Sequence, residues 1–315
     1  VGVDSTPESH SRIVARKGHR KEMIMRFAYH ATMCKPEFYI PLAVAAEDAG
    51  FHSFTVPDSI CYPEHSDSEY PYNGTGDREF LSGVPFLDPF SVISAMGAVT
   101  TKLRFTTSVM KLAIRQPVIV AKSVASVAVL TNNRFGFGVG ISPWPEDFSA
   151  CQVPWEKRGQ RMTEMIEIVK GLLSGEYFSY DGEVFQLDSI QMCPTPSKSV
   201  PILVGGHAAP ALRRAARIAD GFIHAGGTFE DLAMTMKQVD EYRAEYGRDH
   251  LPFEYQCMGA EAFSVDGVSR LEELGVDESI IAFRNPYLAE LDTETLETKI
   301  NNLHNFAEAV IRHCA

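Results

Sequence analysis

The chain has 315 residues, of which 45% are hydrophobic and 22% are charged, and its formal net charge is −12. This composition is typical of a globular protein with a sizeable core, and it excludes global disorder. The negative charge argues against a general nucleic-acid binder. No apolar run approaches the roughly 18 residues that a membrane-spanning helix needs, so no membrane partner is expected.

The six cysteines are scattered along the chain without any C-x-x-C pair. That spacing fits neither a disulfide framework nor a zinc site. The acidic run at residues 64–69 does not have the spacing of a known loop for hard cations. We therefore expect no bound metal and a reducing, cytoplasmic location.

The first 24 residues are rich in Ser, Arg, Lys and His. They lack the apolar block of roughly 7–15 residues that a secretory signal requires. We expect residues 1–24 to be a flexible extension, followed by a single domain over residues 25–315.

From residue 25 onward, short apolar runs rich in β-branched and aromatic residues alternate with stretches of helical period. In the first half of the chain, the pattern predicts strands over residues 25–30, 51–56, 103–110 and 134–140. It predicts helices over residues 36–49, 89–99 and 117–130. Gly50 supplies the C-terminal stop of the first helix.

In the second half, residues 156–173 predict an amphipathic helix, and residues 176–192 predict a hairpin that turns at Asp181 and Gly182. Further strands are predicted over residues 201–204, 221–224, 253–260 and 279–283. Further helices are predicted over residues 209–219, 230–246, 268–274 and 293–311.

Eight sequential strand–helix units predict a (β/α)8 TIM barrel, with a doubly wound sheet as the alternative. Two insertions, residues 60–88 and 142–193, leave from the C-terminal ends of predicted strands. Barrels carry their chemistry at that end. We therefore expect an active site that is covered by these insertions.

Two glycine pairs follow neighbouring predicted strands, Gly205 and Gly206 before His207, and then Gly226 and Gly227. Backbone amides at a strand-to-helix turn can bind phosphate, so the two pairs together favour a phosphorylated cofactor. The glycines of residues 136–140 have a different context, because prolines follow where a Rossmann helix should begin. We interpret them as a strand that lets a flat ligand approach the backbone, with a crowded barrel interior as the alternative.

His30, Asp58 and His224 each fall at the C-terminal end of a predicted strand, which places them around the barrel mouth. Proton transfer needs a group within hydrogen-bond reach of the substrate, and the sequence leaves open which of the three acts. A second set of residues is aromatic and lies on the insertion after the fourth strand. These residues, Trp144, Phe148 and Trp155, are candidates for an apolar lid, or they pack the insertion against the barrel.

Seven segments of the chain together form a recognisable series. They are residues 26–30 (RFAYH), 54–59 (FTVPDS), 107–109 (TSV), 115–117 (RQP), 133–140 (NRFGFGVG), 201–206 (PILVGG) and 219–222 (ADGF). In this order they resemble the bacterial luciferase-like oxidoreductases, and most closely the actinobacterial branch that uses coenzyme F420. The resemblance extends from residue 25 to about residue 283.

The resemblance implies a (β/α)8 barrel with the deazaflavin ring of F420 across its C-terminal mouth. The residues that it assigns to the cofactor's phosphate are Gly205, Gly206, His207, Gly226 and Gly227. Asp58 would face the pyrimidine end of the ring, and Gly140 and Ile141 would line its edge. Ser108 and Val109 would support the ring from behind, and the peptide bond between them would be cis.

Arg158 and Arg161, near the start of the long predicted helix, would meet the acidic tail of the cofactor by the same resemblance. The sequence departs from the sugar-phosphate dehydrogenases of the family at two places, where Ser59 and Pro143 replace their His and Glu. No lysine follows the second glycine pair either. A phosphosugar substrate is therefore not expected.

We expect an oxidoreductase that moves a hydride between F420 and a small organic substrate. Two alternatives stay open. One is an FMN-dependent monooxygenase that uses oxygen and a partner reductase, and the other is a barrel that binds a cofactor without catalysis. The sequence does not name the substrate or the direction of reaction, and it leaves open whether the chain forms a homodimer.

Overall fold

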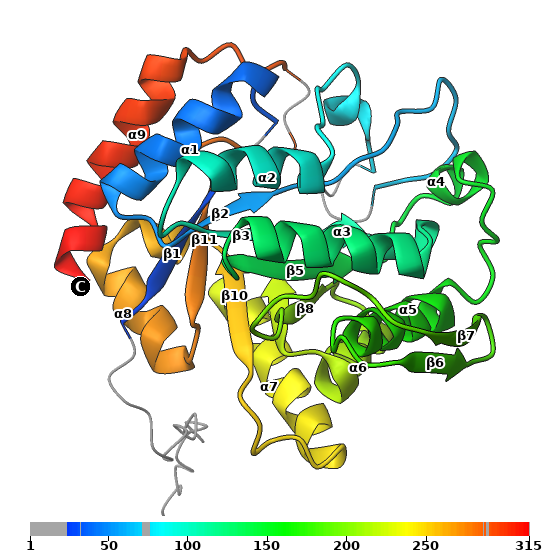
Figure 1. Ribbon diagram of the computed structural model, residues 1–315. Helices are drawn as coiled ribbons and strands as arrows, with labels where there is room; N and C mark the ends of the chain where they lie inside the picture. Colours follow the sequence, from blue (N-terminus) through cyan, green and yellow to red (C-terminus); the bar gives the residue numbers. More distant parts are fainter. Residues whose placement is uncertain (1–23, 32, 71–75, 286, 288–289, 315) are drawn as a thin grey trace, which may run out of the picture.

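The computed structural model describes residues 24–31, 33–70, 76–285, 287 and 290–314, so the predicted N-terminal extension lies outside the described residues except for Ile24. In the described part of the chain, parallel strands close into a barrel of eight strand positions that is surrounded by helices (Figure 1). The predicted (β/α)8 fold is confirmed, and the doubly wound alternative is wrong.

The barrel strands follow the order β3, β2, β1, β11, β10, β9, β8 and β5, and pairing of β3 with β5 closes the ring. Their bounds are β1 Arg26–His30, β2 Ser53–Val56, β3 Arg104–Thr107, β4 Met110–Lys111, β5 Phe135–Gly140, β8 Ile202–Gly205, β9 Gly221–His224, β10 Glu254–Met258 and β11 Glu278–Ile281. Because neighbouring strands are parallel, their C-terminal ends gather at one end of the barrel.

The helices surround the barrel, and several begin at signals that the sequence carries. Their bounds are α1 Tyr39–Ala49, α2 Pro89–Val99, α3 Pro117–Leu130, α5 Arg158–Leu172, α6 Ala209–Ile218, α7 Phe229–Glu245, α8 Val265–Leu274 and α9 Leu296–Ala309. A proline opens both α2 and α3, where its missing amide costs no helical hydrogen bond. Thr228 and Asp231 form a capping box at the start of α7.

The glycines of β5 serve the packing of the barrel. A Cβ atom at Gly138 would lie 1.9 Å from the carbonyl oxygen of Thr107 and 2.8 Å from Cδ1 of Ile223. The Thr107 hydroxyl also donates to the carbonyl oxygen of Gly138 at 2.6 Å. At Gly138 the alternative of a crowded barrel interior therefore holds, and the interpretation that a flat ligand approaches the backbone is wrong at this residue.

The strand predicted over residues 103–110 is divided into β3 and β4. Between them lies the peptide bond of Ser108 and Val109, which is cis, as the family resemblance implied. The Ser108 amide donates to the carbonyl oxygen of Val56 at 2.8 Å, and β4 resumes pairing with β5 at Met110.

The two predicted insertions have different places. Residues 57–88 connect β2 to α2, and residues 141–157, which include α4 Pro145–Ala150, connect β5 to α5, so both leave the C-terminal end of the barrel. The hairpin of β6 Phe178–Asp181 and β7 Gln186–Ile190 follows α5 instead (Figure 1).

The hairpin is fixed to α5 by one carboxylate. Glu164 of α5 accepts hydrogen bonds from the backbone amides of Glu183, Val184 and Phe185 at 2.9, 3.0 and 2.9 Å. The prediction that residues 142–193 as a whole cover the barrel mouth is therefore wrong for the hairpin.

A buried polar cluster lies at the opposite, N-terminal end of the strands. Glu278 is fully buried and accepts hydrogen bonds from the Ser53 hydroxyl and, at 2.7 Å, from the side-chain amide of Gln256. Arg26 forms an ion pair with neighbouring Glu254 at 2.8 Å. Burial, reinforced by the charge of Glu254, raises the pKa of Glu278.

Candidate active site

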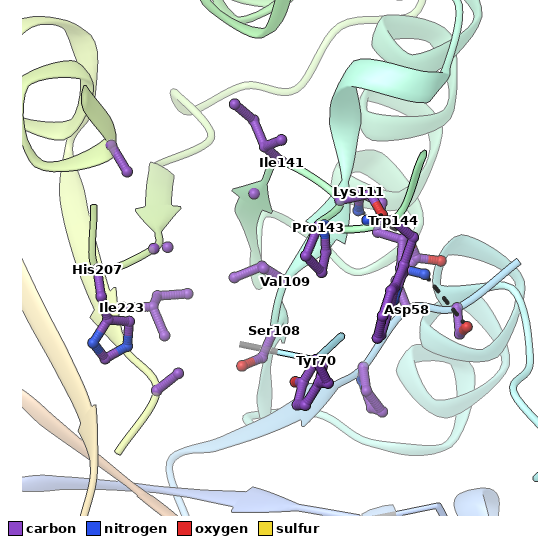
Figure 2. A pocket seen from close by; sticks show the side chains of 18 of the residues that line it. Asp58, Tyr70, Ser108, Val109, Lys111, Ile141, Pro143, Trp144, His207 and Ile223 are labelled. Carbon is purple, nitrogen blue, oxygen red and sulfur yellow. Dashed lines mark hydrogen bonds between the residues drawn. The ribbon is translucent and has the colours of Figure 1, made fainter. Parts of the chain in front are cut away.

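A cavity of about 720 Å³ opens at the C-terminal end of the barrel. Its volume lies in the range typical of small-molecule sites. The predicted site residues that line it are His30, Asp58, Ser108, Val109, Gly140, Ile141, Arg158, Gly205, Gly206, His207 and His224. Figure 2 shows His207 and Ile223 on one side of the opening, Tyr70 and Trp144 on the other, and Val109 between them.

Gly226 and Gly227 line a second cavity of about 620 Å³, which shares His207 and other residues with the first. Gly206, Gly226 and Gly227 have φ values of 127°, 108° and 121°, a region that favours glycine. A Cβ atom at Gly226 would meet nothing closer than 3.9 Å. The Cβ positions of Gly206 and Gly227 have closer neighbours, Ala211 Cβ at 3.0 Å and Asp231 Oδ2 at 3.3 Å. Open backbone therefore lies at Gly226, near the junction of the two cavities, where an anion could bind.

Two histidines lie beside these turns. The ring centroids of His207 and His224 are 4.7 Å apart. His224 is only 1% exposed, and its Nε2 atom has no hydrogen-bond partner among the described residues. Burial and the neighbouring His207 ring lower the pKa of His224 to about 4, so it is neutral at pH 7. A ligand atom or a water beside Nε2 would satisfy this buried nitrogen.

The predicted arginines do not both reach the cavity. Arg158 lines it, with its guanidinium carbon 3.7 Å from the centroid of the Trp155 ring. Arg161 lines neither cavity, because its guanidinium donates to the carbonyl oxygens of Pro154 at 2.9 Å and Glu156 at 3.3 Å. A contact of Arg161 with the cofactor tail is therefore not supported.

A different arginine takes part in the cavity wall. Arg214 of α6 lines the cavity and donates to the Thr163 hydroxyl and to the carbonyl oxygen of Gly159, each at 3.0 Å. Burial lowers its pKa to about 10. The sequence analysis missed Arg214, since it lies in a helical run of arginines and alanines that carries no motif.

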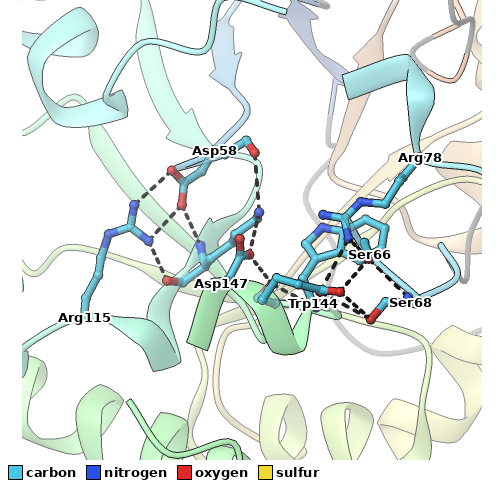
Figure 3. A network of polar contacts seen from close by, with 11 residues as sticks. Asp58, Ser66, Ser68, Arg78, Arg115, Trp144 and Asp147 are labelled. Carbon is cyan, nitrogen blue, oxygen red and sulfur yellow. Dashed lines mark hydrogen bonds and ion pairs between the residues drawn. The ribbon is translucent and has the colours of Figure 1, made fainter. Parts of the chain in front are cut away.

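Asp58 is held in a network at the cavity wall (Figure 3). Arg115 contacts both oxygens of its carboxylate at 2.9 Å, and the backbone amide of Lys111 donates to it at 2.8 Å. Such a bidentate pair fixes the position and orientation of the carboxylate. The geometry therefore gives Asp58 a positioning role and does not support the predicted proton transfer. The RQP segment that contains Arg115 could be recognised in the sequence, but its ion pair with Asp58 could not.

A second ion pair in Figure 3 joins Lys111 of β4 to Asp147 of α4. The Lys111 ammonium lies 2.7 Å from the carboxylate of Asp147, which also accepts the Ser142 hydroxyl at 2.5 Å. Asp147 is 1% exposed. The sequence analysis missed both Lys111 and Asp147, because no local pattern signals a partner 36 residues away.

His30 lies at the end of β1 and lines the cavity. Its Nδ1 atom is 2.8 Å from the hydroxyl oxygen of Thr55, and Nε2 has no partner among the described residues. Burial lowers the pKa of His30 to about 4, so the ring is neutral at pH 7. The hydrogen bond to Thr55 holds the ring in place and leaves Nε2 for a ligand.

Four aromatic side chains, Tyr70, Phe80, Trp144 and Tyr287, line the cavity, and we call them the aromatic roof. Tyr287 also lines the second cavity, which Gly226 and Gly227 line as well. Tyr70 stacks on Trp144 with ring centroids 5.3 Å apart and an angle of 21°. Tyr70 also lies 5.1 Å from Phe80 and 5.5 Å from Tyr287.

The predicted lid residues are divided between the cavity and the core. Trp144 and Trp155 line the cavity. Phe148 is buried and lines neither cavity, and it packs edge-on against Trp155 at 5.0 Å. The insertion is therefore held to the barrel by Phe148, while Trp144 borders the cavity and is itself buried.

Among the described residues, no group of three or more His, Cys, Asp or Glu side chains is arranged to hold a metal ion. In the same part of the chain, none of the helices combines the length and the apolar character that a bilayer crossing requires.

Comparison with known proteins gives related sequences. An uncharacterised protein of Mycobacterium tuberculosis is 52% identical over 287 residues, which cover 91% of this chain and 99% of the relative. An F420-dependent glucose-6-phosphate dehydrogenase of Nakamurella multipartita is 29% identical over 216 residues, which cover 64% of this chain and 57% of the relative.

Two solved structures share the fold. A monooxygenase from Streptomyces bottropensis superimposes with a TM-score of 0.73 at 16% identity, covering 92% of this chain and 100% of the other. A coenzyme F420-dependent tetrahydromethanopterin reductase from Methanopyrus kandleri gives a TM-score of 0.70 at 14% identity, covering 92% of this chain and 99% of the other. The profile of one family, described as luciferase-like monooxygenase, matches residues 26–267, and the chain belongs to this family.

Proposed function

We propose that this protein is an oxidoreductase that moves a hydride between coenzyme F420 and a small organic substrate. The observation that carries the proposal is a cavity at the barrel mouth with two glycine turns at one side. The relative from Nakamurella multipartita, which is named as F420-dependent, supports the choice of cofactor within the family.

The residues of this chain fit such a cofactor. Its phosphate would be held by the backbone of Gly205, Gly206, Gly226 and Gly227, with His207 beside them. The unpartnered Nε2 atom of His224 supports a polar ligand at this place. Arg158 has no carboxylate partner among the described residues and would meet the acidic tail.

The ring would lie against Ser108 and Val109, with Gly140 and Ile141 along its edge. When bound, F420 supplies a ring carbon that accepts or gives a hydride. The chain holds the substrate carbon beside that position and excludes water under the insertions, and such positioning supplies much of the rate in enzymes of this kind.

Among the three predicted proton-transfer candidates, His30 is favoured. Asp58 is occupied by Arg115, and His224 lies beside the proposed phosphate site. Neutral His30, held through Nδ1 by Thr55, can accept or give a proton at Nε2. His30→Gln should lower turnover by about 100-fold and leave F420 affinity nearly unchanged. Unchanged turnover would assign the proton transfer to another group.

The cofactor assignment is tested by titrating the purified protein with F420, FMN and FAD side by side. We expect F420 to bind most tightly. Equal or tighter binding of FMN would contradict the proposal and favour the FMN-dependent monooxygenase, whose oxygen consumption with a reductase could then be measured. Tight binding of F420 without turnover of any substrate would favour the non-catalytic alternative.

A further inference from the structure

The two sides of the main cavity differ in chemistry. The aromatic roof has four rings from three separate segments of the chain, and its Tyr70 and Trp144 lie on the side away from His207 (Figure 2). Two of the rings, Tyr70 and Trp144, stack on each other (Figure 2). Aromatic walls of this kind favour flat apolar ligands, because ring contacts add to the burial of apolar surface.

The charged groups behind the roof are paired within the protein, although Nε of Arg78 has no hydrogen-bond partner among the described residues. Arg78 lies with its guanidinium carbon 3.7 Å from the centroid of the Trp144 ring, and it pairs with Glu146 at 3.4 Å. Ser66 and Ser68 donate to the same carboxylate at 2.5 and 3.0 Å (Figure 3). Arg78 does not line the cavity. This cluster therefore stabilises the roof and offers no charge to a ligand beneath it.

The charged groups that line the cavity near the roof are also paired. Asp58 is bound to Arg115, and Lys111 is bound to Asp147. An ionised ligand group at this position would lose its hydration and gain no ionic partner, at a considerable cost in free energy. The roof side of the cavity therefore selects against charged ligands.

Among the described residues, four further cations line the two cavities. Lys157 is paired with Glu183, and Arg284, in the second cavity, donates to the carbonyl oxygen of Glu290. Arg158 and Arg214 belong to α5 and α6, which flank the glycine turn at Gly206. If the proposed function is correct, the phosphate and the acidic tail of the cofactor occupy this side. The roof is then the part of the cavity that remains for the substrate.

We propose that the aromatic roof binds the substrate, and that the substrate is a planar, conjugated molecule without an ionised group. This proposal rests on the proposed function, which assigns the opposite side of the cavity to the cofactor. Tyr70, which is half-buried, offers its ring to the substrate, and the buried Trp144 supports it from behind. The paired charges of Asp58 and Lys111 select against sugar phosphates and carboxylates.

The experiment uses the two tryptophans of the chain, Trp144 and Trp155. Trp155→Phe leaves Trp144 as the single tryptophan, and Trp144→Phe is the matched control that leaves Trp155. The probes are 2-acetylnaphthalene, which is planar and uncharged, 2-naphthoate, which is planar and anionic, and cyclohexyl methyl ketone, which is not planar. Each probe is titrated with oxidised F420 present and absent, and calorimetry supplies dissociation constants in the wild type.

We expect 2-acetylnaphthalene to quench Trp144 saturably and to bind at least about 10-fold more tightly than the other two probes. Tyr70→Ala should weaken its binding by about fivefold or more, as loss of an aromatic pair predicts, while Tyr70→Phe should bind like the wild type. Equal affinity for 2-naphthoate, or an unchanged affinity in Tyr70→Ala, would overturn the proposal. Thermal unfolding checks that each variant is folded.

The same titrations separate the two proposals. A protein that binds F420 but does not bind 2-acetylnaphthalene would overturn the roof assignment and leave the proposed function intact. A protein that binds 2-acetylnaphthalene at Trp144 but does not bind F420 would contradict the proposed function.

Discussion

Gly206, in the first glycine turn, has a backbone conformation and a close neighbour that disfavour any side chain. Its φ is 127°, and a Cβ atom there would lie 3.0 Å from Cβ of Ala211. Gly206→Val places a branched side chain where the phosphate would approach the backbone. We expect F420 affinity to fall by about 10-fold or more, measured by titration.

The control for Gly206→Val is Gly247→Val. Gly247 also has a positive φ, 64°, but nothing lies within 4 Å of its Cβ position, and it lines neither cavity. Both variants should lose on the order of 1 kcal/mol of stability or more through backbone strain. Only Gly206→Val should lose cofactor affinity, and unchanged affinity would remove the phosphate assignment.

His30 gives the folded chain a pH dependence. Burial lowers its pKa from 6.5 to about 4, so between these values the unfolded chain binds a proton that the folded chain does not. Stability therefore falls as the pH decreases from 6.5 toward 4. At pH 5 this difference in proton binding lowers the free energy of unfolding by about 2 kcal/mol relative to neutral pH.

His30→Gln should remove this part of the loss, so that urea unfolding at pH 7 and pH 5 differs less in the variant than in the wild type. His304→Gln, at an exposed position on α9, is the control. An equal loss in the wild type and in His30→Gln would show that His30 is not buried in its neutral form.

Asp58 and Arg161 show what single residues in a sequence do not reveal. Position at a strand end predicted correctly that Asp58 lies at the cavity, but its role depends on Arg115, 57 residues away. Arg161 lies in the first turn of α5, within the predicted helix, yet its guanidinium donates to carbonyl oxygens of the preceding loop. Side-chain direction depends on such contacts, which no spacing rule describes.

At the scale of elements, α4 is held to the barrel by the buried pair of Lys111 and Asp147. Asp147→Ala would leave the Lys111 ammonium buried without its partner, which costs about 3 kcal/mol. We expect a lower unfolding free energy and faster proteolysis within residues 141–157. Glu308 lies on α9 and forms an exposed ion pair with Arg312. Glu308→Ala breaks this pair and should change the free energy of unfolding by less than about 1 kcal/mol. Equal losses in both variants would contradict the role of Asp147 in holding α4.

Element boundaries could be predicted where a local signal marks them. The predicted ranges of α2, α3 and β9 agree with the structure at both ends. Their starts were marked by a proline in α2 and α3 and by a glycine in β9. The β6–β7 hairpin was also predicted, but not its place beside α5. That place depends on Glu164, whose partners Glu183 to Phe185 lie about 20 residues further along the chain.

At the scale of the whole molecule, the polar cluster around Glu278 sits inside the closed barrel. The raised pKa of Glu278 means that ionising it costs the folded state more than the unfolded state. The free energy of unfolding is therefore higher at acid pH, where Glu278 is protonated in both states, and it falls as the pH rises. Glu278→Gln stays neutral, and its amide can donate to the buried Gln256 Oε1 atom, which has no partner among the described residues.

We expect Glu278→Gln to raise the unfolding temperature by about 2 °C at pH 8 and by less at pH 5. Differential scanning calorimetry at the two pH values measures this difference. Glu308→Gln, on the exposed face of α9, controls for the change in net charge. A variant that is destabilised more at pH 8 than at pH 5 would contradict the assignment of a raised pKa.

The fold class followed from the count of alternating units, but the closure of the barrel did not. Closure depends on β3 pairing with β5, Phe105 opposite Phe135, and on the interior contact of Gly138 with Thr107. Both are contacts between strands about 30 residues apart, and the periodicity of either strand alone is compatible with an open sheet.

The two sides of the cavity are encoded in different stretches of the chain. The glycine turns belong to adjacent strand–helix units in the second half. Three of the four roof rings, Tyr70, Phe80 and Trp144, belong to two insertions in the first half, and Tyr287 lies between β11 and α9. Mutations that accumulate in the insertions can thus alter the roof without touching the turns that we propose to hold F420. If that proposal is correct, a lineage built on this barrel can diversify its substrates one insertion at a time while it inherits a single way of binding its coenzyme.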